Sequence, residues 1–144
     1  MTSKVLVVEP TRAVALAIAA VLERRDYRVT VVGDAAEANL RPGRFDCGVF
    51  SDILPDGNGI SLAGWLLAEN RVACAVFFGH AEDVDTRLRA SNLGTYLHRN
   101  DGLHALSAAV AEAVEDTLER ARAVGAGDET QRRVELKSGK RRRR

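Results

Sequence analysis

The chain has 144 residues, of which 46% are hydrophobic and 28% are charged. These proportions exclude a wholly disordered chain and a membrane protein. The length suits one domain, since a single core usually serves about 100–200 residues. The net charge of +1 is unevenly distributed. Residues 1–124 carry 13 Lys/Arg and 17 Asp/Glu, a net charge of −4, whereas residues 125–144 carry 8 and 3, a net charge of +5. Binding partners are therefore considered separately for the acidic part, residues 1–124, and the basic part, residues 125–144.

Features that mark disulfide frameworks, metal sites or targeting segments are sparse in this sequence. Cys47 and Cys74 are too few for a disulfide framework and lie in apolar segments. We interpret them as small buried side chains in a reducing compartment, which predicts a cytoplasmic protein. The three histidines have no ligand spacing, so no metal site is expected from them. No signal peptide and no apolar run of about 20 residues is visible, so no membrane span is expected.

Strand-type and helix-type patterns alternate along the chain. Apolar, β-branched runs predict strands at residues 4–8, 27–32, 46–51, 72–78 and 94–98. Helical spacing of apolar residues predicts helices at 11–25, 34–40, 60–69, 82–91 and 103–124. Thr11 is the expected cap of the first helix, and Asp34 with Glu37 forms a capping-box pattern at the second. Trp65 is expected to pack against the protein from the third helix.

Five β-α repeats predict an α/β fold, a doubly wound three-layer sandwich with a five-stranded parallel sheet. Right-handed crossovers favour the flavodoxin-like strand order 2-1-3-4-5. In that order the direction of winding changes between the first and third strands, so polar residues after these strands should form the functional site.

The last helix and the tail leave alternatives open. A helix over 103–124 would be about 33 Å long, which exceeds the sheet, and its apolar stripe at Val114, Leu118 and Ala121 would face a second protomer, a partner helix or only solvent. Residues 125–144 lack apolar periodicity and are expected to be a basic, disordered tail. The run from Arg141 to Arg144 could bind nucleic acid, an acidic protein or anionic lipid, or remain solvated. The predicted domain is therefore 1–124, followed by the tail 125–144.

Several motifs occur in an order that resembles a known family. Lys4–Val8 is followed by an acidic residue, Phe45-Asp46 precedes Pro55-Asp-x-x-Gly59, and Val76–His80 precedes Gly94–Leu97. This order resembles the receiver domain of bacterial two-component response regulators, the CheY-like domain, over residues 3 to about 118. The resemblance implies an acidic pair and a phospho-accepting Asp that together hold Mg²⁺, a Thr or Ser and a Lys that bind the phosphoryl group, and an aromatic switch residue.

The residues at those positions depart from the family pattern. Matching the motifs places Glu9 and Pro10 at the acidic pair, Ser51 at the phospho-acceptor, Phe78 at the Thr/Ser, Arg99 at the Lys, Asn100 at the following proline, and Tyr96 at the switch aromatic. Proline supplies no carboxylate, a serine hydroxyl cannot form an acyl phosphate, and phenylalanine cannot donate to a phosphate oxygen. Glu9 is expected either to cap the first helix or to pair with Arg99.

The resulting interpretation is a stand-alone, degenerate receiver, a pseudo-receiver that is not an enzyme and works as a phosphorylation-independent interaction module without a cofactor. Its expected partner is a histidine kinase or another regulator, or a second copy, bound through the face made by residues 82–91, 94–98 and 103–124. One alternative is a phosphorelay receiver that uses Asp52, in which case Glu9 and Asp52 would hold Mg²⁺. Another is a protein that associates with nucleic acid through its basic tail.

Overall fold

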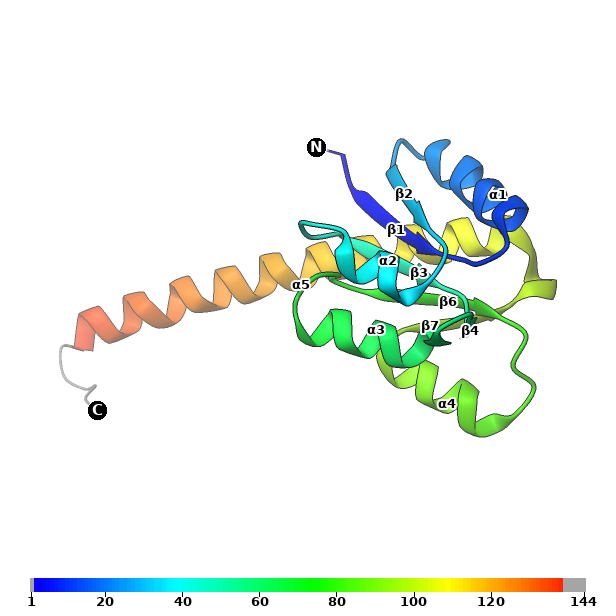
Figure 1. Cartoon of the computed structure of the whole chain (residues 1–144). Coiled ribbons are helices and arrows are strands. Elements are labelled where there is room, and N and C mark those ends of the chain that lie inside the picture. Colours follow the sequence, from blue (N-terminus) through cyan, green and yellow to red (C-terminus); the bar gives the residue numbers. More distant parts are fainter. Residues whose placement is uncertain (1, 139–144) are drawn as a thin grey trace. The chain divides into compact units, whose positions relative to one another are not determined.

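The computed structural model describes residues 2–138, with side chains described through Val124. The five strands of one sheet alternate along the chain with five helices (Figure 1). The sheet strands are β1 (Lys4–Val8), β2 (Arg28–Val32), β3 (Cys47–Phe50), β6 (Ala75–Gly79) and β7 (Thr95–His98). The helices are α1 (Arg12–Glu23), α2 (Ala35–Leu40), α3 (Gly59–Ala68), α4 (Val84–Leu93) and α5 (Gly102–Ser138), and the short 3₁₀ helix η1 (Arg99–Asp101) precedes α5.

The sheet has the strand order β2-β1-β3-β6-β7, and all its pairings are parallel. Counted within the sheet, this is the predicted order 2-1-3-4-5, so the predicted doubly wound α/β fold is confirmed. A two-stranded antiparallel hairpin, β4 (Ile53–Leu54) with β5 (Gly57–Asn58), was not predicted and occupies the expected turn after β3. Ser51 and Asp52, the site residues that follow β3, lie between the end of β3 and this hairpin.

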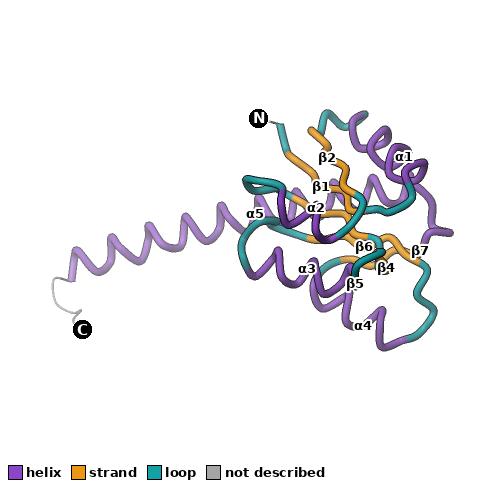
Figure 2. Tube along the Cα trace, viewed as in Figure 1, coloured by secondary structure: helices purple, strands orange, loops and turns teal. Residues whose placement is uncertain are grey.

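Helices lie on both faces of the sheet (Figure 2). A hydrophobic cluster of buried side chains lies on each face. One combines strand residues with buried side chains of α2, α3 and α4, such as Ala38, Leu66 and Ala90. The other combines strand residues with α1 and α5, such as Leu22 and Val110. Because side chains alternate along a strand, neighbouring residues of β3 point into different clusters, and the same alternation separates Ser51 from Asp52 at the strand end.

The start of α2 is held by carboxylates from two loops. Asp34 accepts from the Glu37 amide at 2.8 Å, as predicted, and Asp56 accepts from the Ala35 and Ala36 amides at 3.0 and 3.1 Å. The Glu37 side chain accepts from the Gly33 amide rather than closing a capping box on Asp34. These bonds satisfy first-turn amides that a six-residue helix leaves without internal partners, and they tie the β4–β5 hairpin to α2.

Two local predictions were wrong, and a third holds only in part. Trp65 is 56% exposed, because Leu62, Ala63 and Leu66 supply the buried face of α3. Thr11 is the N-cap residue of α1, as predicted, but its side chain makes no capping bond. The final helix does not end near Val124 but continues to Ser138.

The segment expected to be disordered is therefore helical in residues 125–138, and residues 139–144, with the Arg141–Arg144 run, lie outside the described residues. Apolar periodicity indicates a buried helix face, whereas helix formation also depends on intrinsic propensity. Eight of the 14 residues from 125 to 138 are Ala, Glu, Gln, Arg, Leu or Lys, which favour helices, although Gly125 and Gly127 do not. The chain separates into two compact units, residues 1–114 and 115–144. Within the part of the chain that is described, no helix is both long and apolar enough to cross a membrane.

Candidate functional site

The sheet register brings the predicted site residues to one edge. Val8, Phe50, Phe77 and Tyr96 are successive partners across β1, β3, β6 and β7. The residues one step further along the first three strands are Glu9, Ser51 and Phe78, so they meet at the carboxyl ends of the strands. Arg99 begins the 3₁₀ helix directly after β7 and reaches back across this edge. The predicted position of the site is thus occupied by a compact group of four side chains.

Arg99 and Glu9 form a buried ion pair at the centre of this group. Arg99 Nη2 donates to Glu9 Oε1, and the two side chains are only 15% and 3% exposed. The other oxygen, Glu9 Oε2, accepts from the Thr11 amide at 3.0 Å. Both alternatives for Glu9, pairing with Arg99 and binding the start of α1, therefore occur together. The carboxylate is fully engaged by a cation and an amide that belong to the chain itself.

Ser51 joins the same group through its hydroxyl. Its Oγ accepts from Arg99 Nη2 at 3.3 Å and donates to the Ile53 carbonyl at 3.1 Å. Gly59, the first residue of α3, lies so close that an added Cβ would fall 1.7 Å from the Ser51 carbonyl oxygen. The hydroxyl is therefore held by contacts within the protein, on a strand end that α3 approaches closely.

Phe78 fills the remaining space next to Arg99. The Arg99 Cζ atom lies 5.1 Å from the centre of the Phe78 ring, within the range of a cation–π contact. Arg99 Nε is buried and has no hydrogen-bond partner among the described residues, so Arg99 is held mainly by Glu9, Ser51 and this ring. A buried ring in this place removes the hydrogen-bond donor that a Thr or Ser would offer to a phosphate.

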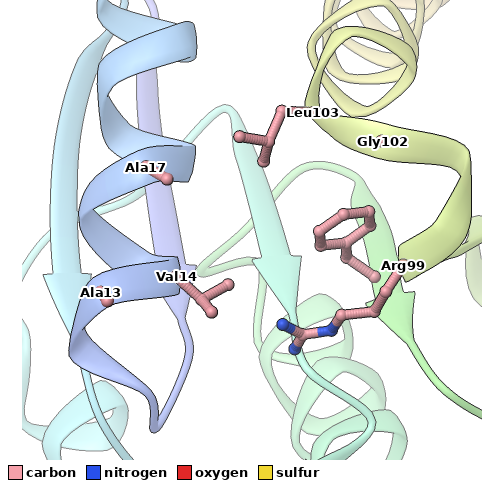
Figure 3. Close-up of a pocket in the computed structure, with 7 residues that line it drawn as sticks. Ala13, Val14, Ala17, Arg99, Gly102 and Leu103 are labelled. Carbon is pink, nitrogen blue, oxygen red and sulfur yellow. The ribbon is translucent and has the colours of Figure 1, made fainter.

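An apolar cavity of about 340 Å³ adjoins the Arg99–Phe78 pair. Figure 3 shows Ala13, Val14 and Ala17 of α1 facing Leu103 and Gly102 of α5, with the Arg99 side chain extending across the opening. Small side chains on both helices leave the space open. Arg99 and Phe78 therefore belong both to the polar group with Glu9 and Ser51 and to the lining of the apolar cavity.

Asp52 makes a different set of contacts. Its carboxylate packs on Gly79, where an added Cβ would fall 2.4 Å from Asp52 Cγ, and Oδ2 accepts from the Tyr96 hydroxyl at a long 3.5 Å. Tyr96 in turn accepts from the Ala81 amide at 2.7 Å and stacks under Arg87, with Arg87 Cζ 5.5 Å from the ring centre. Asp52 and Tyr96 thus form a second group beside α4.

The environment of Tyr96 shifts its titration. Partial burial raises the pKa of the phenol, and the nearby Asp52 carboxylate raises it further, whereas the Ala81 amide opposes this effect by donating to the oxygen. The hydroxyl therefore stays protonated at neutral pH and can donate to Asp52. The predicted switch position is held by these contacts between the β6–α4 loop, β3 and α4.

The remaining predicted positions lie at the margin of the site. Pro10 is exposed and lines a shallow cavity with Glu9 and Arg12. The Asn100 amide donates to His98 Nδ1 at 3.1 Å within the short 3₁₀ helix. No packing role was predicted for Gly59 or Gly79, although Gly59 belongs to one of the motifs; in the structure their lack of a Cβ allows the close approaches to Ser51 and Asp52. Their position at the ends of adjacent elements was the signal available for them.

The magnesium ion that the resemblance implies does not fit these residues. Mg²⁺ prefers several oxygen ligands in octahedral geometry. Here Glu9 already binds a guanidinium, Pro10 offers no oxygen ligand from its side chain, and Asp52 contacts Gly79 and Tyr96 instead of joining Glu9. Among the side chains that the structure describes, no group of three or more His, Cys, Asp or Glu residues is placed to hold a metal ion. The Glu9, Ser51 and Arg99 side chains thus bind mainly one another rather than offering ligands to a metal ion.

Neither a protein-family model nor a curated protein matches the sequence. Solved structures do match. A CheY-like receiver domain from Methanospirillum hungatei superposes with a TM-score of 0.75 at 18% identity, covering 83% of this chain and 99% of that chain. The HemR receiver domain from Leptospira biflexa gives a TM-score of 0.70 at 27% identity, covering 78% and 94%.

A third match is the signal receiver domain of a modulated diguanylate cyclase from Desulfovibrio desulfuricans, with a TM-score of 0.69 at 26% identity and coverage of 83% and 99%. The protein has the receiver-domain fold. The resemblance noted in the sequence is thereby supported by the structure, and nearly the whole of each of these receiver domains has a counterpart here. At this receiver-like edge, a guanidinium pairs with Glu9 and Ser51.

Proposed function

We propose that this chain is a degenerate receiver that acts in two-component-type signalling without being phosphorylated, as a protein-interaction module and not as an enzyme. The observation that carries the proposal is the buried contact of Arg99 with both Glu9 and Ser51. In a phosphorylatable receiver, carboxylates at this edge hold a metal ion that neutralises an incoming phosphoryl group. Here an internal cation neutralises the remaining carboxylate, and the acceptor position carries a hydroxyl.

Burial makes this replacement hard to reverse. Removing one partner of a buried ion pair leaves an uncompensated charge, which typically costs about 3–5 kcal/mol. A metal ion or phosphoryl group would have to displace Arg99 from Glu9 and would then meet the ring of Phe78 rather than a hydroxyl donor. Phosphorylation would here have to break the contacts of Arg99 with Glu9 and Ser51, and this cost would offset the free energy that new phosphoryl contacts provide. A constitutive conformation is therefore the favoured outcome.

The proposed partner surface is the face formed by α4, β7 and the first part of α5. Val84 and Leu88 of α4 are large apolar side chains exposed on this face, spaced four residues apart on one side of the helix. Isolated exposed apolar residues are ordinary, but a pair on one helix face beside the Arg87–Tyr96 stack offers a small hydrophobic contact with a polar rim. A kinase, another regulator or a second copy in the cytoplasm is the proposed occupant.

The deciding experiment follows backbone amide NMR signals of the full chain during titration with beryllofluoride and Mg²⁺. We expect no saturable shift changes in the natural chain. A designed variant with Pro10→Asp, Ser51→Asp, Phe78→Thr and Arg99→Lys is the matched positive control, because it restores the family pattern at four positions. Saturable changes in the natural chain would overturn the proposal. If those changes disappear in Asp52→Asn, the phosphorelay alternative would take its place.

The partner surface is tested by sedimentation velocity over a range of concentrations. If the face supports a homodimer, Leu88→Asp should weaken self-association, while Leu40→Asp, which changes an exposed leucine at the end of α2, should not. Equal effects of the two substitutions would remove this face as the dimer surface.

A further inference from the structure

A second cavity lies on the α4 side of the site, apart from the Arg99 group. It has a volume of about 190 Å³ and is lined by Asp52, Ile53, Asn58, His80, Ala81, Asp83 and Thr86. This is smaller than the ~300–1,000 Å³ of a drug-sized ligand site but several times the ~30 Å³ share of one water molecule. The cavity therefore has room for a small polar head group.

Asp52 is the unusual member of this lining. It is 94% buried, since only 6% of its surface is exposed, yet it takes part in neither of the two ion pairs found among the described residues. Its hydrogen bond from Tyr96 measures 3.5 Å, which is long for an O–H···O bond, and Oδ1 has no hydrogen-bond partner among the described residues. A buried carboxylate is costly unless it is paired and hydrogen-bonded.

The close packing on Gly79 keeps Asp52 in this position. A side chain at residue 79 would overlap the carboxylate, so the glycine creates the space that lets Asp52 lie inward. Strand alternation directs Asp52 away from the face on which Arg99 reaches Ser51. The cation that neutralises the first group is therefore not the partner of this carboxylate.

A second carboxylate lines the same cavity. Asp83 is itself exposed, at the rim of the cavity. Its Oδ2 accepts from the hydroxyl and the amide of Thr86 at 2.7 and 2.9 Å, and these bonds, with a smaller contribution from the charge of Arg89, lower the pKa of Asp83, so it is ionised at neutral pH. Its Oδ1 has no hydrogen-bond partner among the residues described. Nearby, Arg87 is directed elsewhere, because its Nε donates to the Ala81 carbonyl and its guanidinium stacks on Tyr96. Two carboxylates with unused oxygens therefore line one small cavity.

From this we infer that the cavity between the end of β3 and the start of α4 binds an organic monocation, a guanidinium or primary ammonium group, through Asp52 and Asp83. Such a group supplies several N–H donors and one positive charge, which match the unused carboxylate oxygens. A divalent metal fits less well, since no cluster of three acidic, His or Cys ligands is present among the described side chains. The inference does not depend on the proposed function.

Binding at this site would also affect Tyr96. A bound cation would donate hydrogen bonds to the Asp52 carboxylate and so compete with the long bond from the Tyr96 hydroxyl. The bond from the Ala81 amide to Tyr96 would remain. The signals of Asp52, Ala81 and Tyr96 should therefore report occupancy together. The head group could come from a free small amine or from an Arg or Lys side chain of another protein.

The test is an amide NMR titration of the full chain with methylguanidinium chloride at constant ionic strength, with the neutral isostere methylurea as the control ligand. We expect saturable shift changes centred on residues 52, 58, 80–83 and 86 with methylguanidinium only. Asp52→Asn should weaken binding at least tenfold, and Asp83→Asn several-fold, because Asn keeps the helix cap but removes the charge. Asp85→Asn, on the same helix but outside the cavity lining, should change the affinity less than twofold.

Three results would overturn the inference: no saturable response, an equal response to methylurea, or unchanged affinity in both Asp52→Asn and Asp83→Asn. If Asp52→Asn does not fold, the comparison of Asp83→Asn with Asp85→Asn still decides the matter. Blocked Gly-Arg-Gly and Gly-Lys-Gly peptides then distinguish the sources. Tighter binding of a peptide than of methylguanidinium or methylammonium assigns a protein side chain, and the reverse assigns a free small cation.

Discussion

Arg99 donates from a single nitrogen, Nη2, to both the Glu9 carboxylate and the Ser51 hydroxyl, and so joins the ends of β7, β1 and β3. These three residues are far apart in the sequence and meet only because the sheet places their strands in the order β1-β3-β6-β7. The contact makes Arg99 a structural cross-link at the edge where receiver domains carry out their chemistry.

We expect Arg99→Ala to lower the free energy of unfolding by about 2–4 kcal/mol, since it leaves Glu9 buried without a cation; the range is below that of a fully buried pair because Arg99 is partly exposed. The double variant Glu9→Gln with Arg99→Ala should recover part of this loss. Urea unfolding followed by circular dichroism measures both. Arg89→Ala, an exposed residue of α4, is the control and should change stability by less than about 0.5 kcal/mol. A loss no larger than that of the control would show that the pair contributes little.

Gly79→Ala tests the packing of Asp52. The new Cβ would fall 2.4 Å from Asp52 Cγ, so the carboxylate must move, and we expect a destabilisation of about 1–3 kcal/mol. The same substitution in an Asp52→Ala background removes the overlap and should cost clearly less. Thermal unfolding of the natural chain, the two single variants and the double variant gives the four stabilities of this double-mutant cycle. Identical costs in the two backgrounds would mean that the strain arises from the backbone rather than from Asp52.

Asp56 should make the stability depend on pH. The amides of Ala35 and Ala36 hold the pKa of Asp56 below its usual value, with the Ala35 bond the larger cause. A lowered pKa in the folded state means that the stabilisation is present above the unfolded pKa, near 4, and is lost as the pH falls through the lower folded value. The difference in urea midpoint between the natural chain and Asp56→Ala should therefore shrink below about pH 4. A difference that persists unchanged to pH 2 would contradict this.

The two cysteines should differ in reactivity. Cys47 is fully buried, and its hydrogen bond with Cys74, followed by burial, raises the pKa of its thiol, so little thiolate forms. Cys74 is less buried and its thiol contacts the Asp46 carbonyl at 3.2 Å. The single-cysteine variant Cys74→Ala loses the bond with Cys74 but keeps Cys47 buried, so we expect the native variant to react with a thiol reagent at least tenfold more slowly than Cys47→Ala. Equal native rates would contradict the expected protection, and equal rates in urea provide the control.

Much of the fold could be read from the sequence, because the strands are short apolar runs and the helices carry regular apolar spacing. The errors have physical causes. Trp65 lies at helical spacing from buried residues, but α3 needs only one narrow face against the sheet, so its ring is exposed. The end of α5 was misjudged because residues 125–138 lack the apolar periodicity by which the other helices were predicted, although several of their residue types have high helix propensity. The hairpin after β3 has too few residues for a visible strand pattern.

The sequence by itself determined the order of the strands, the edge at which the polar residues collect, and the identities that depart from the receiver pattern at Pro10, Ser51, Phe78 and Arg99. Only the tertiary structure decided how these residues use one another. A side chain's partner depends on register and on strand alternation, and these separate two neighbours, Ser51 and Asp52, into different groups. The first is joined to Arg99, and the second faces a small cavity with an unused oxygen because Gly79 leaves it room.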